Sequence, residues 1–189
     1  MNKERRGGVF ETVTEGNELV VEGYAAVTES ITTLYEIDGV EYKEIIDSGA
    51  FDGCDMNDVP FKYNHSDDFL VLARTRNNTL ELTVDEKGLK VRAKLADVNA
   101  GRDLYELIRR GDINKMSFAF VVERDSYDSL TRTRRILSIK KIYDVSAVDT
   151  PAYQDTDIAV SARDYFTAKA EIERQNADKR KRLMLLTMV

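Results

Sequence analysis

Three side chains in this sequence are of the types that serine catalysis requires. Ser117 lies in an apolar run, His65 is the single histidine of the chain, and Asp144 lies inside a second apolar run. A serine hydroxyl becomes a nucleophile when a base accepts its proton and a third group orients that base. Each residue also has an ordinary interpretation: a buried strand serine, an inert surface histidine, or an edge aspartate that faces water or pairs with Lys140 or Arg135. The residue types alone leave catalysis and structure both open.

The run around Ser117 predicts a strand with two different faces, because side chains alternate between faces along a strand. One face would hold Phe118, Phe120 and Val122, and the other Ser117, Ala119 and Val121. The aromatic face would anchor the backbone in a core. The serine would then project beside a small alanine, which leaves room for a substrate.

The acid that would orient His65 has more than one candidate. Asp144 lies in the interior of the predicted strand 136–148, where an ionised carboxylate is unfavourable unless it has a partner. Asp67, Asp68 and Asp149 lie in turns, where aspartate is common. We therefore expect Asp144 to be the partner of His65, with Asp68, Asp149 or a water molecule as alternatives.

Composition and charge exclude several classes of protein. The net charge of -6 disfavours nucleic acid as a partner, because phosphate binding needs a basic face. No apolar run approaches the ~20 residues of a membrane helix, and the first ten residues lack the apolar core of a secretory signal. The single cysteine rules out an internal disulfide bond and favours a cytosolic compartment. We expect no membrane partner.

Metal and thiol chemistry have little support in the sequence. One histidine cannot build a multi-histidine zinc site, and Cys54 with His65 would be a poor ligand set. We expect no metal and no cofactor. A cysteine enzyme that uses Cys54 is a weaker alternative, because its Gly- and Asp-rich turn lacks the positive charge that would lower a thiol pKa.

The elements that must position these residues are mostly strands. Residues 18–27 and 42–46 have β-forming composition, and 80–84 and 89–95 alternate around a Gly-containing turn, which predicts a hairpin. Residues 97–110 have helical periodicity and end at Gly111. Residues 1–17 are expected to form a frayed start or a short strand. The loops expected are 28–38 and 47–60, with a loop or hairpin turn at 123–135.

The C-terminal region differs in charge from the rest. Residues 163–182 contain seven basic and four acidic residues, whereas the remaining 169 residues contain 21 basic and 30 acidic ones. Such an asymmetry favours a basic helical extension over 163–189 on an acidic domain over 1–162. It is either a solvated helix that packs on the domain or a removable, partner-binding piece.

An ordered set of short motifs resembles the prohead maturation proteases of tailed bacteriophages, which are serine endopeptidases. The motifs are GYA at 23–25, SGAF at 48–51, NH at 64–65, GL at 88–89, GDI at 111–113, MSFAF at 116–120, YDVSAV at 143–148 and PAY at 151–153. The resemblance covers residues 18–160. The ordered set is more specific than any one of its members.

The resemblance implies a fold distantly similar to herpesvirus assemblin, a mainly β (α+β) fold with a β-barrel, peripheral helices and a helical C-terminal tail. It makes His65 the base and Ser117 the nucleophile. Asp144 takes a position where the family usually has glutamate, and where assemblins use a second histidine. Backbone N–H groups of Ala152 and Tyr153 become candidates for the oxyanion site.

The resemblance also implies the biological role. We expect a serine endopeptidase that cleaves major capsid protein and scaffold segments, and itself, during prohead maturation. It would act inside the prohead in the host cytoplasm, as a homo-oligomer and possibly a dimer. The alternative is a non-catalytic capsid scaffold or binding protein with a β-barrel, in which Ser117 is structural.

Overall fold

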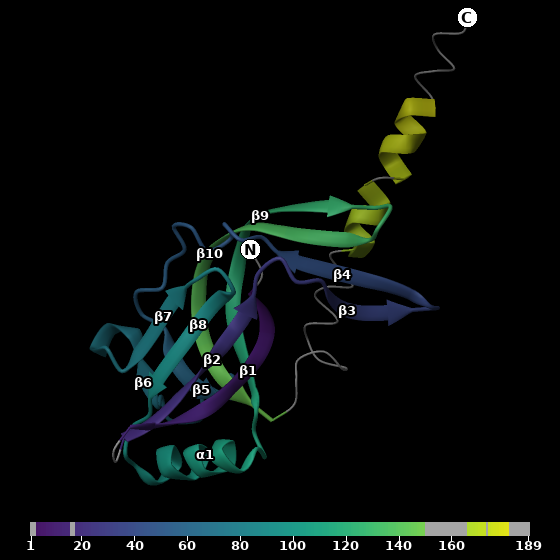
Figure 1. The fold of residues 1–189 in the computed structure, drawn as a ribbon. Coiled ribbons are helices and arrows are strands. Elements are labelled where there is room, and N and C mark those ends of the chain that lie inside the picture. Colours follow the sequence, from purple (N-terminus) through teal and green to yellow (C-terminus); the bar gives the residue numbers. More distant parts are fainter. Residues whose placement is uncertain (1–2, 16–17, 150–165, 173, 182–189) are drawn as a thin grey trace, which may run out of the picture.

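The computed structural model describes residues 3–15, 18–149, 166–172 and 174–181, and most of the described chain lies in strands (Figure 1). The strands are β1 (Glu4–Glu15), β2 (Glu18–Val27), β3 (Thr32–Ile37), β4 (Val40–Ile46), β5 (Pro60–Tyr63), β6 (Ala73–Arg74), β7 (Leu80–Val84), β8 (Gly88–Lys94), β9 (Lys115–Asp128) and β10 (Thr133–Val148). A single 3-10 turn, η1 (Thr75–Asn77), and helix α1 (Asn99–Arg110) interrupt the series within residues 3–149.

These strands form one mixed sheet. Its main path runs β3-β4-β10-β9-β1-β2-β8-β7, and β5 joins it by pairing with β10 and with β6. Most pairs are antiparallel, but β10 runs parallel to both β4 and β5. The mainly β prediction is confirmed. In the described part of the chain, however, the sheet does not close into a complete barrel, because its path ends at β3 and at β7.

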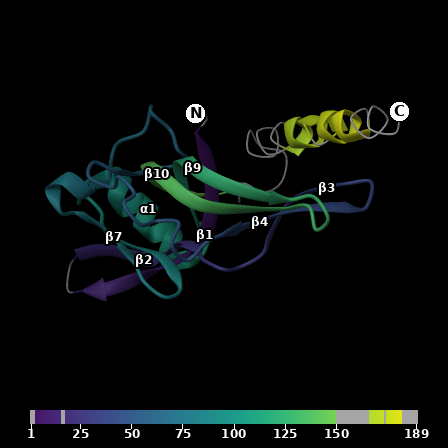
Figure 2. The same cartoon turned by 90° about the horizontal axis from the view of Figure 1, so that it is seen from above.

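The outer ends of four strands extend beyond the rest of the sheet. The hairpin β3–β4 and the tips of β9 and β10 extend together away from the remaining strands (Figures 1 and 2). β9 runs on to Asp128 and β10 begins at Thr133, so the polar stretch 123–135 is largely paired strand around a short turn. Parallel pairing of β10 with β4 attaches the β3–β4 hairpin to β10.

The core lies on the aromatic face of β9, as the alternation predicts. Phe118 and Phe120 are fully buried and stack with ring centroids 4.6 Å apart. Helix α1 contributes Leu104 and Ile108 to the same core and ends at Gly111, whose φ of 84° is the left-handed conformation of a helix C-terminus. The predicted helix and the predicted β7–β8 hairpin are both confirmed.

Strand β1 is a full strand of twelve residues that serves two partners. Its first half pairs with β9, where Gly7 lies opposite Ser117, and its second half pairs with β2. The two ranges meet at Val9. A Cβ atom on Gly8 would lie 1.9 Å from the carbonyl oxygen of Tyr24, so only glycine permits this close crossing.

Two sequence expectations are corrected by the sheet. Residues 1–17 were expected to be frayed or to hold a short strand, yet β1 is central because β9 lies on one side of it and β2 on the other. The expected loop over 28–38 contains β3, which pairs with β4 across a two-residue turn at Asp38 and Gly39. Both turn residues have positive φ, 51° and 76°, as tight hairpins require.

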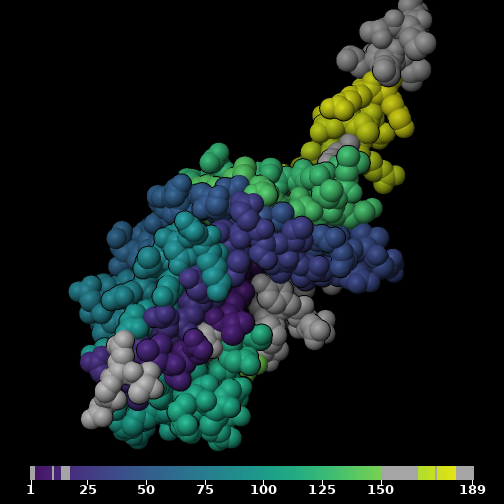
Figure 3. Space-filling model, viewed as in Figure 1, coloured from purple at the N-terminus to yellow at the C-terminus, as the bar shows by residue number. Residues whose placement is uncertain are grey.

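The C-terminal helix covers residues 166–181, with residue 173 outside the description, and it projects from the body (Figures 1 and 3). Phe166 is buried with Leu34 against the rings of Tyr35, Tyr42 and Tyr127. Most other described residues of the helix are exposed. Phe166 therefore anchors the start of the helix to the sheet extension. The expected boundary between 162 and 163 lies outside the described residues.

Candidate active site

Strand β10 brings together the three residues that the sequence singles out. Asp144 lies on β10 itself, and Ser117 lies on the antiparallel neighbour β9. His65 follows the end of the parallel neighbour β5, where the N–H of Asn64 still donates to the carbonyl oxygen of Ala147 at 2.8 Å. β10 and its two neighbours therefore bring together side chains that are up to 79 positions apart in the chain.

His65 and Asp144 form a hydrogen-bonded pair. The imidazole Nδ1 bonds to Asp144 Oδ1, and the exposed fractions of the two side chains are 6% and 2%. Burial alone would raise the pKa of the Asp144 carboxyl. The hydrogen bond and charge of His65, followed by the charge of Lys3 with its Nζ 3.4 Å from Oδ2, outweigh burial and hold that pKa below its ordinary value. Asp144 is thus a carboxylate that faces the imidazole.

Ser146 is a fourth polar residue at this point, and sequence reasoning missed it as a site residue. Its Oγ accepts the backbone N–H of His65 at 3.2 Å, lies 3.1 Å from Asp144 Oδ1, and lies 3.2 Å from His65 Nδ1. The signal was available, because residues two apart on a strand share a face and Ser146 follows Asp144 by two. Ser146 is also directly opposite Ser117 in the β9–β10 register.

Ser117 lies on the same face as the pair. Residues directly opposite each other in antiparallel strands have side chains on one face, with Cα atoms about 4.5–5.5 Å apart, and Ser117 is opposite Ser146. Among the described residues, two buried side-chain polar atoms have no hydrogen-bond partner, Ser117 Oγ and His65 Nε2. Such buried unpaired groups are rare and costly, and a catalytic role is one reason for their presence.

A family model described as caudovirus prohead serine protease matches residues 9–171. The chain belongs to this family. No curated protein and no solved structure gives a significant match. The protein is therefore a serine endopeptidase of phage capsid maturation, and it acts within the assembling capsid, in the host cytoplasm, on capsid or scaffold proteins. No described helix of this prohead protease is long and apolar enough to cross a membrane.

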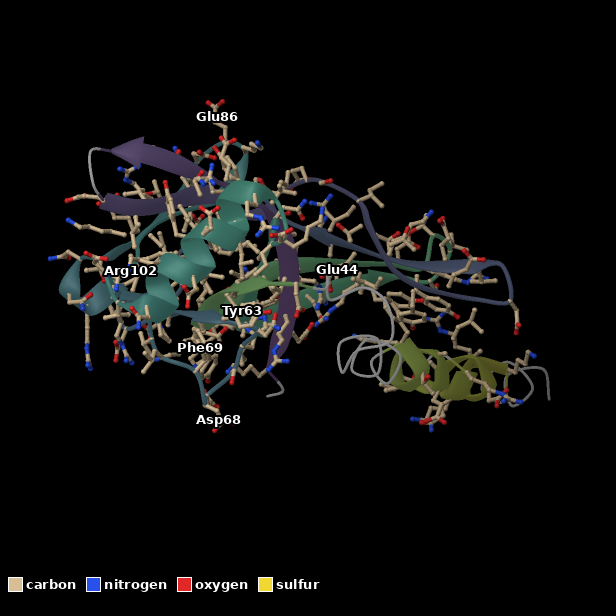
Figure 4. All side chains as sticks on the ribbon, turned by 90° about the horizontal axis from the view of Figure 1, so that it is seen from below. Glu44, Tyr63, Asp68, Phe69, Glu86 and Arg102 are labelled. Atoms are coloured by element: carbon tan, nitrogen blue, oxygen red, sulfur yellow. The ribbon has the colours of Figure 1, made fainter. Side chains whose placement is uncertain are left out.

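The alternative acids of the prohead protease have other positions. Asp149 Oδ2 accepts hydrogen bonds from Tyr63 Oη and Asn64 Nδ2, both at 3.0 Å, so it supports the turn that carries His65. Asp68 is exposed at the outer tip of the following loop and points away from Tyr63 (Figure 4). Asp144 is the acid that contacts the imidazole.

The interpretation of Asp144 as an edge aspartate that faces water or pairs with Arg135 is wrong. Its carboxylate is buried rather than facing water as an edge aspartate would. Arg135, one of the two cations considered for it, instead bonds to Glu29 at 2.9 Å and to Asp47 at 3.0 Å.

The thiol of the prohead protease is unsuited to nucleophilic attack. Burial raises the pKa of Cys54 to about 11, so little thiolate exists at neutral pH. This observation weighs against the cysteine-enzyme alternative. Ala152 and Tyr153, the expected backbone donors for the oxyanion, lie outside the described residues.

Proposed function

We propose that Ser117, His65 and Asp144 are the nucleophile, base and orienting acid of this prohead protease. The observation that carries the proposal is the His65–Asp144 hydrogen bond through Nδ1, which leaves Nε2 of His65 buried and unpaired, as Ser117 Oγ also is. A histidine that donates from Nδ1 to a carboxylate offers the lone pair of Nε2 to a serine hydroxyl. Asp144 reaches the imidazole although its side chain is one methylene shorter than glutamate.

The reaction follows from these positions. Nε2 of His65 takes the Ser117 proton as Oγ attacks the scissile carbonyl, and Asp144 stabilises the resulting imidazolium. The protonated Nε2 then gives its proton to the leaving amine, which breaks the peptide bond and leaves an acyl ester on Ser117. A water molecule, activated in the same way, hydrolyses the ester and regenerates the enzyme. We assign no side chain to the oxyanion.

Labelling with a fluorophosphonate tests the triad. We expect one adduct, on Ser117 by mass spectrometry, and no adduct in Ser117→Ala or His65→Ala. Loss of the acid in other serine proteases lowers kcat about 10^4-fold, so Asp144→Asn should react far more slowly. Ser138→Ala is the matched control, since Ser138 lies on β10 with Asp144 but bonds to Glu123 at 2.7 Å. Peptide cleavage retained in Ser117→Ala would refute the mechanism.

We further propose that the substrates include segments of the major capsid protein and scaffold, and the enzyme itself. Family membership supports this proposal. Concentrated active protein should shorten its own chain over time, whereas the Ser117→Ala protein should keep its full mass. A labelling rate per molecule that rises with protein concentration would support an active homodimer. A protein that neither reacts nor cleaves at high concentration would favour the scaffold alternative.

The basic extension 163–189 is proposed as a separate, partner-binding piece. Its described helix exposes Arg174, Lys179, Arg180 and Lys181, while Phe166 alone is buried. An exposed basic helix suits an acidic surface on a scaffold or capsid protein.

A further inference from the structure

We propose that Ser146 is a positioning residue that fixes the backbone of His65 and the orientation of the Asp144 carboxylate, which in turn sets the tautomer of His65. The proposal rests on the proposed function, in which His65 is the base. It concerns a residue that does not touch the substrate and acts only through the histidine–aspartate pair. Ser146 has no solvent exposure, so its hydroxyl must find its partners inside the protein.

The position of the Ser146 hydroxyl gives it two tasks. Its oxygen accepts the backbone N–H of His65 at 3.2 Å, which ties the base to β10. Its proton is directed to Asp144 Oδ1 at 3.1 Å. The backbone of His65 needs such a tie, because its φ of 55° is the left-handed conformation that non-glycine residues adopt at a cost. The preceding Asn64 has the same conformation, with a φ of 51°.

The number of protons shared by Ser146, His65 and Asp144 determines which ring nitrogen of His65 is protonated. A serine hydroxyl has one proton, and an ionised carboxylate can only accept. If Nδ1 of His65 were unprotonated, its lone pair would face Asp144 Oδ1, and the single Ser146 proton could not serve both acceptors. With the proton on Nδ1, the imidazole donates to Asp144 and the Ser146 proton also goes to Asp144. Nε2 is then the unprotonated nitrogen, which is the form a general base requires.

The same contacts argue that Ser146 is not the nucleophile. Its Oγ lies 3.2 Å from Nδ1 of His65, but Nδ1 is engaged with Asp144 and cannot serve as base for Ser146. A nucleophile would need the unpaired nitrogen, Nε2. In Ser146→Ala, fluorophosphonate should therefore still react at Ser117, only more slowly. If the unsubstituted protein carried the adduct on Ser146 and none on Ser117, the assignment would be overturned.

The single histidine makes the tautomer directly measurable. In the Ser117→Ala protein, which cannot digest itself, 15N-labelled histidine gives the two ring-nitrogen signals of His65 alone. We expect an Nδ1-protonated imidazole with a slowly exchanging N–H signal. Adding Ser146→Ala should keep the proton on Nδ1, because Asp144 still accepts it, but should make its exchange faster, and adding Ser138→Ala should leave the exchange rate unchanged. An unchanged exchange rate of the Nδ1 proton in the Ser146→Ala protein would overturn the proposal.

Kinetics give a second readout. Loss of a hydrogen bond to a charged group corresponds to about 10- to 100-fold, so Ser146→Ala should lower kcat by that factor with KM unchanged. Ser146→Thr, which keeps the hydroxyl, should recover most of the activity. If Ser146→Ala does not fold, Ser146→Cys offers a weaker donor of similar size and should change kcat and the exchange rate of the Nδ1 proton in the same direction. Normal kcat in Ser146→Ala refutes only this inference, whereas activity in Ser117→Ala refutes the triad.

Discussion

At the scale of single residues, the site depends on one carboxylate placed inside a strand. Asp144 is buried and yet ionised, because His65, Ser146 and Lys3 all contribute favourable contacts to it. Burying a charge without partners would cost several kcal/mol. The three partners come from different parts of the chain, so the ionised state of Asp144 depends on the fold being complete.

The pKa of Asp144 predicts a stability effect in acid. Because the pKa of Asp144 in the folded protein lies below its ordinary value of 3.8, the ionised group stabilises the fold above that value, and the contribution is lost as pH falls through the lower folded pKa. The free energy of unfolding in urea should be compared between the Ser117→Ala protein and the same protein with Asp144→Asn added. We expect a gap between the two at pH 5 that narrows by pH 3. A gap that widens over this range would contradict the assignment.

The sequence was sufficient to predict His65, Ser117 and Asp144 as candidates, and Asp144 was suspected for a physical reason: strands rarely hold an unpaired carboxylate. Geometry was needed to separate Asp144 from Asp68 and Asp149, because turns and strands can place any of them near a histidine. Ser146 was missed because serine is common in strands. Its place beside Asp144 could have been inferred from their spacing of two on a strand, but its contact with the backbone N–H of His65 could not.

At the scale of elements, β10 determines the site. It pairs antiparallel with β9 and parallel with β5, so it holds the serine strand and the histidine turn on either side of Asp144 and Ser146. Periodicity predicted the strands near Ser117 and Asp144, and the helix α1. It could not predict the pairing order, because parallel neighbours such as β5 and β10 are far apart in sequence.

Strand β3 shows the limits of local patterns. The dipeptide Asp38-Gly39 is a strong hairpin signal, but Leu34 is the one residue of β3 that is fully buried, so the strand lacks the apolar alternation that identifies strands. The burial of Leu34 arises from Phe166, a residue of the C-terminal helix. A contact across more than 130 positions lies beyond the reach of local sequence reasoning.

The C-terminal helix gives a prediction at the same scale. A chain that ends at Ala170 keeps the aromatic anchor Phe166 but loses the exposed basic residues. If the helix binds a capsid or scaffold partner, this truncated protein should be incorporated into proheads in fewer copies, as measured by quantitative mass spectrometry of purified particles. Its unfolding midpoint should match that of the full chain. Equal incorporation of both proteins would contradict the proposed role of the extension.

At the scale of the whole molecule, a buried ionic network joins distant strands. Glu44 on β4 bonds to Arg6 on β1 at 2.6 Å and to Arg134 on β10 at 3.3 Å. Arg134 also bonds to Glu4 and to Asp125, both at 2.7 Å. Burial would lower the pKa of Arg134, but these acids raise it above its ordinary value. The network fixes the first half of β1, and with it the strand that borders Ser117.

Removing one member of this network should destabilise the fold. Glu44→Gln leaves two buried guanidinium groups with less negative charge, and breaking a buried ion pair costs about 3–5 kcal/mol. Glu41→Gln is the matched control on the same strand, since the Glu41–Lys43 pair is solvent-accessible and should change stability by less than ~1 kcal/mol. Urea unfolding in the Ser117→Ala background measures both. Equal effects of the two substitutions would show that the network contributes little.

The complete burial of Ser117 has a consequence for when the enzyme is active. A polypeptide substrate cannot reach a fully enclosed hydroxyl, so each turnover must begin with a local opening of the protein. We therefore expect local opening, rather than the chemical steps, to limit kcat. Inactivation by a small probe would level off at the opening rate.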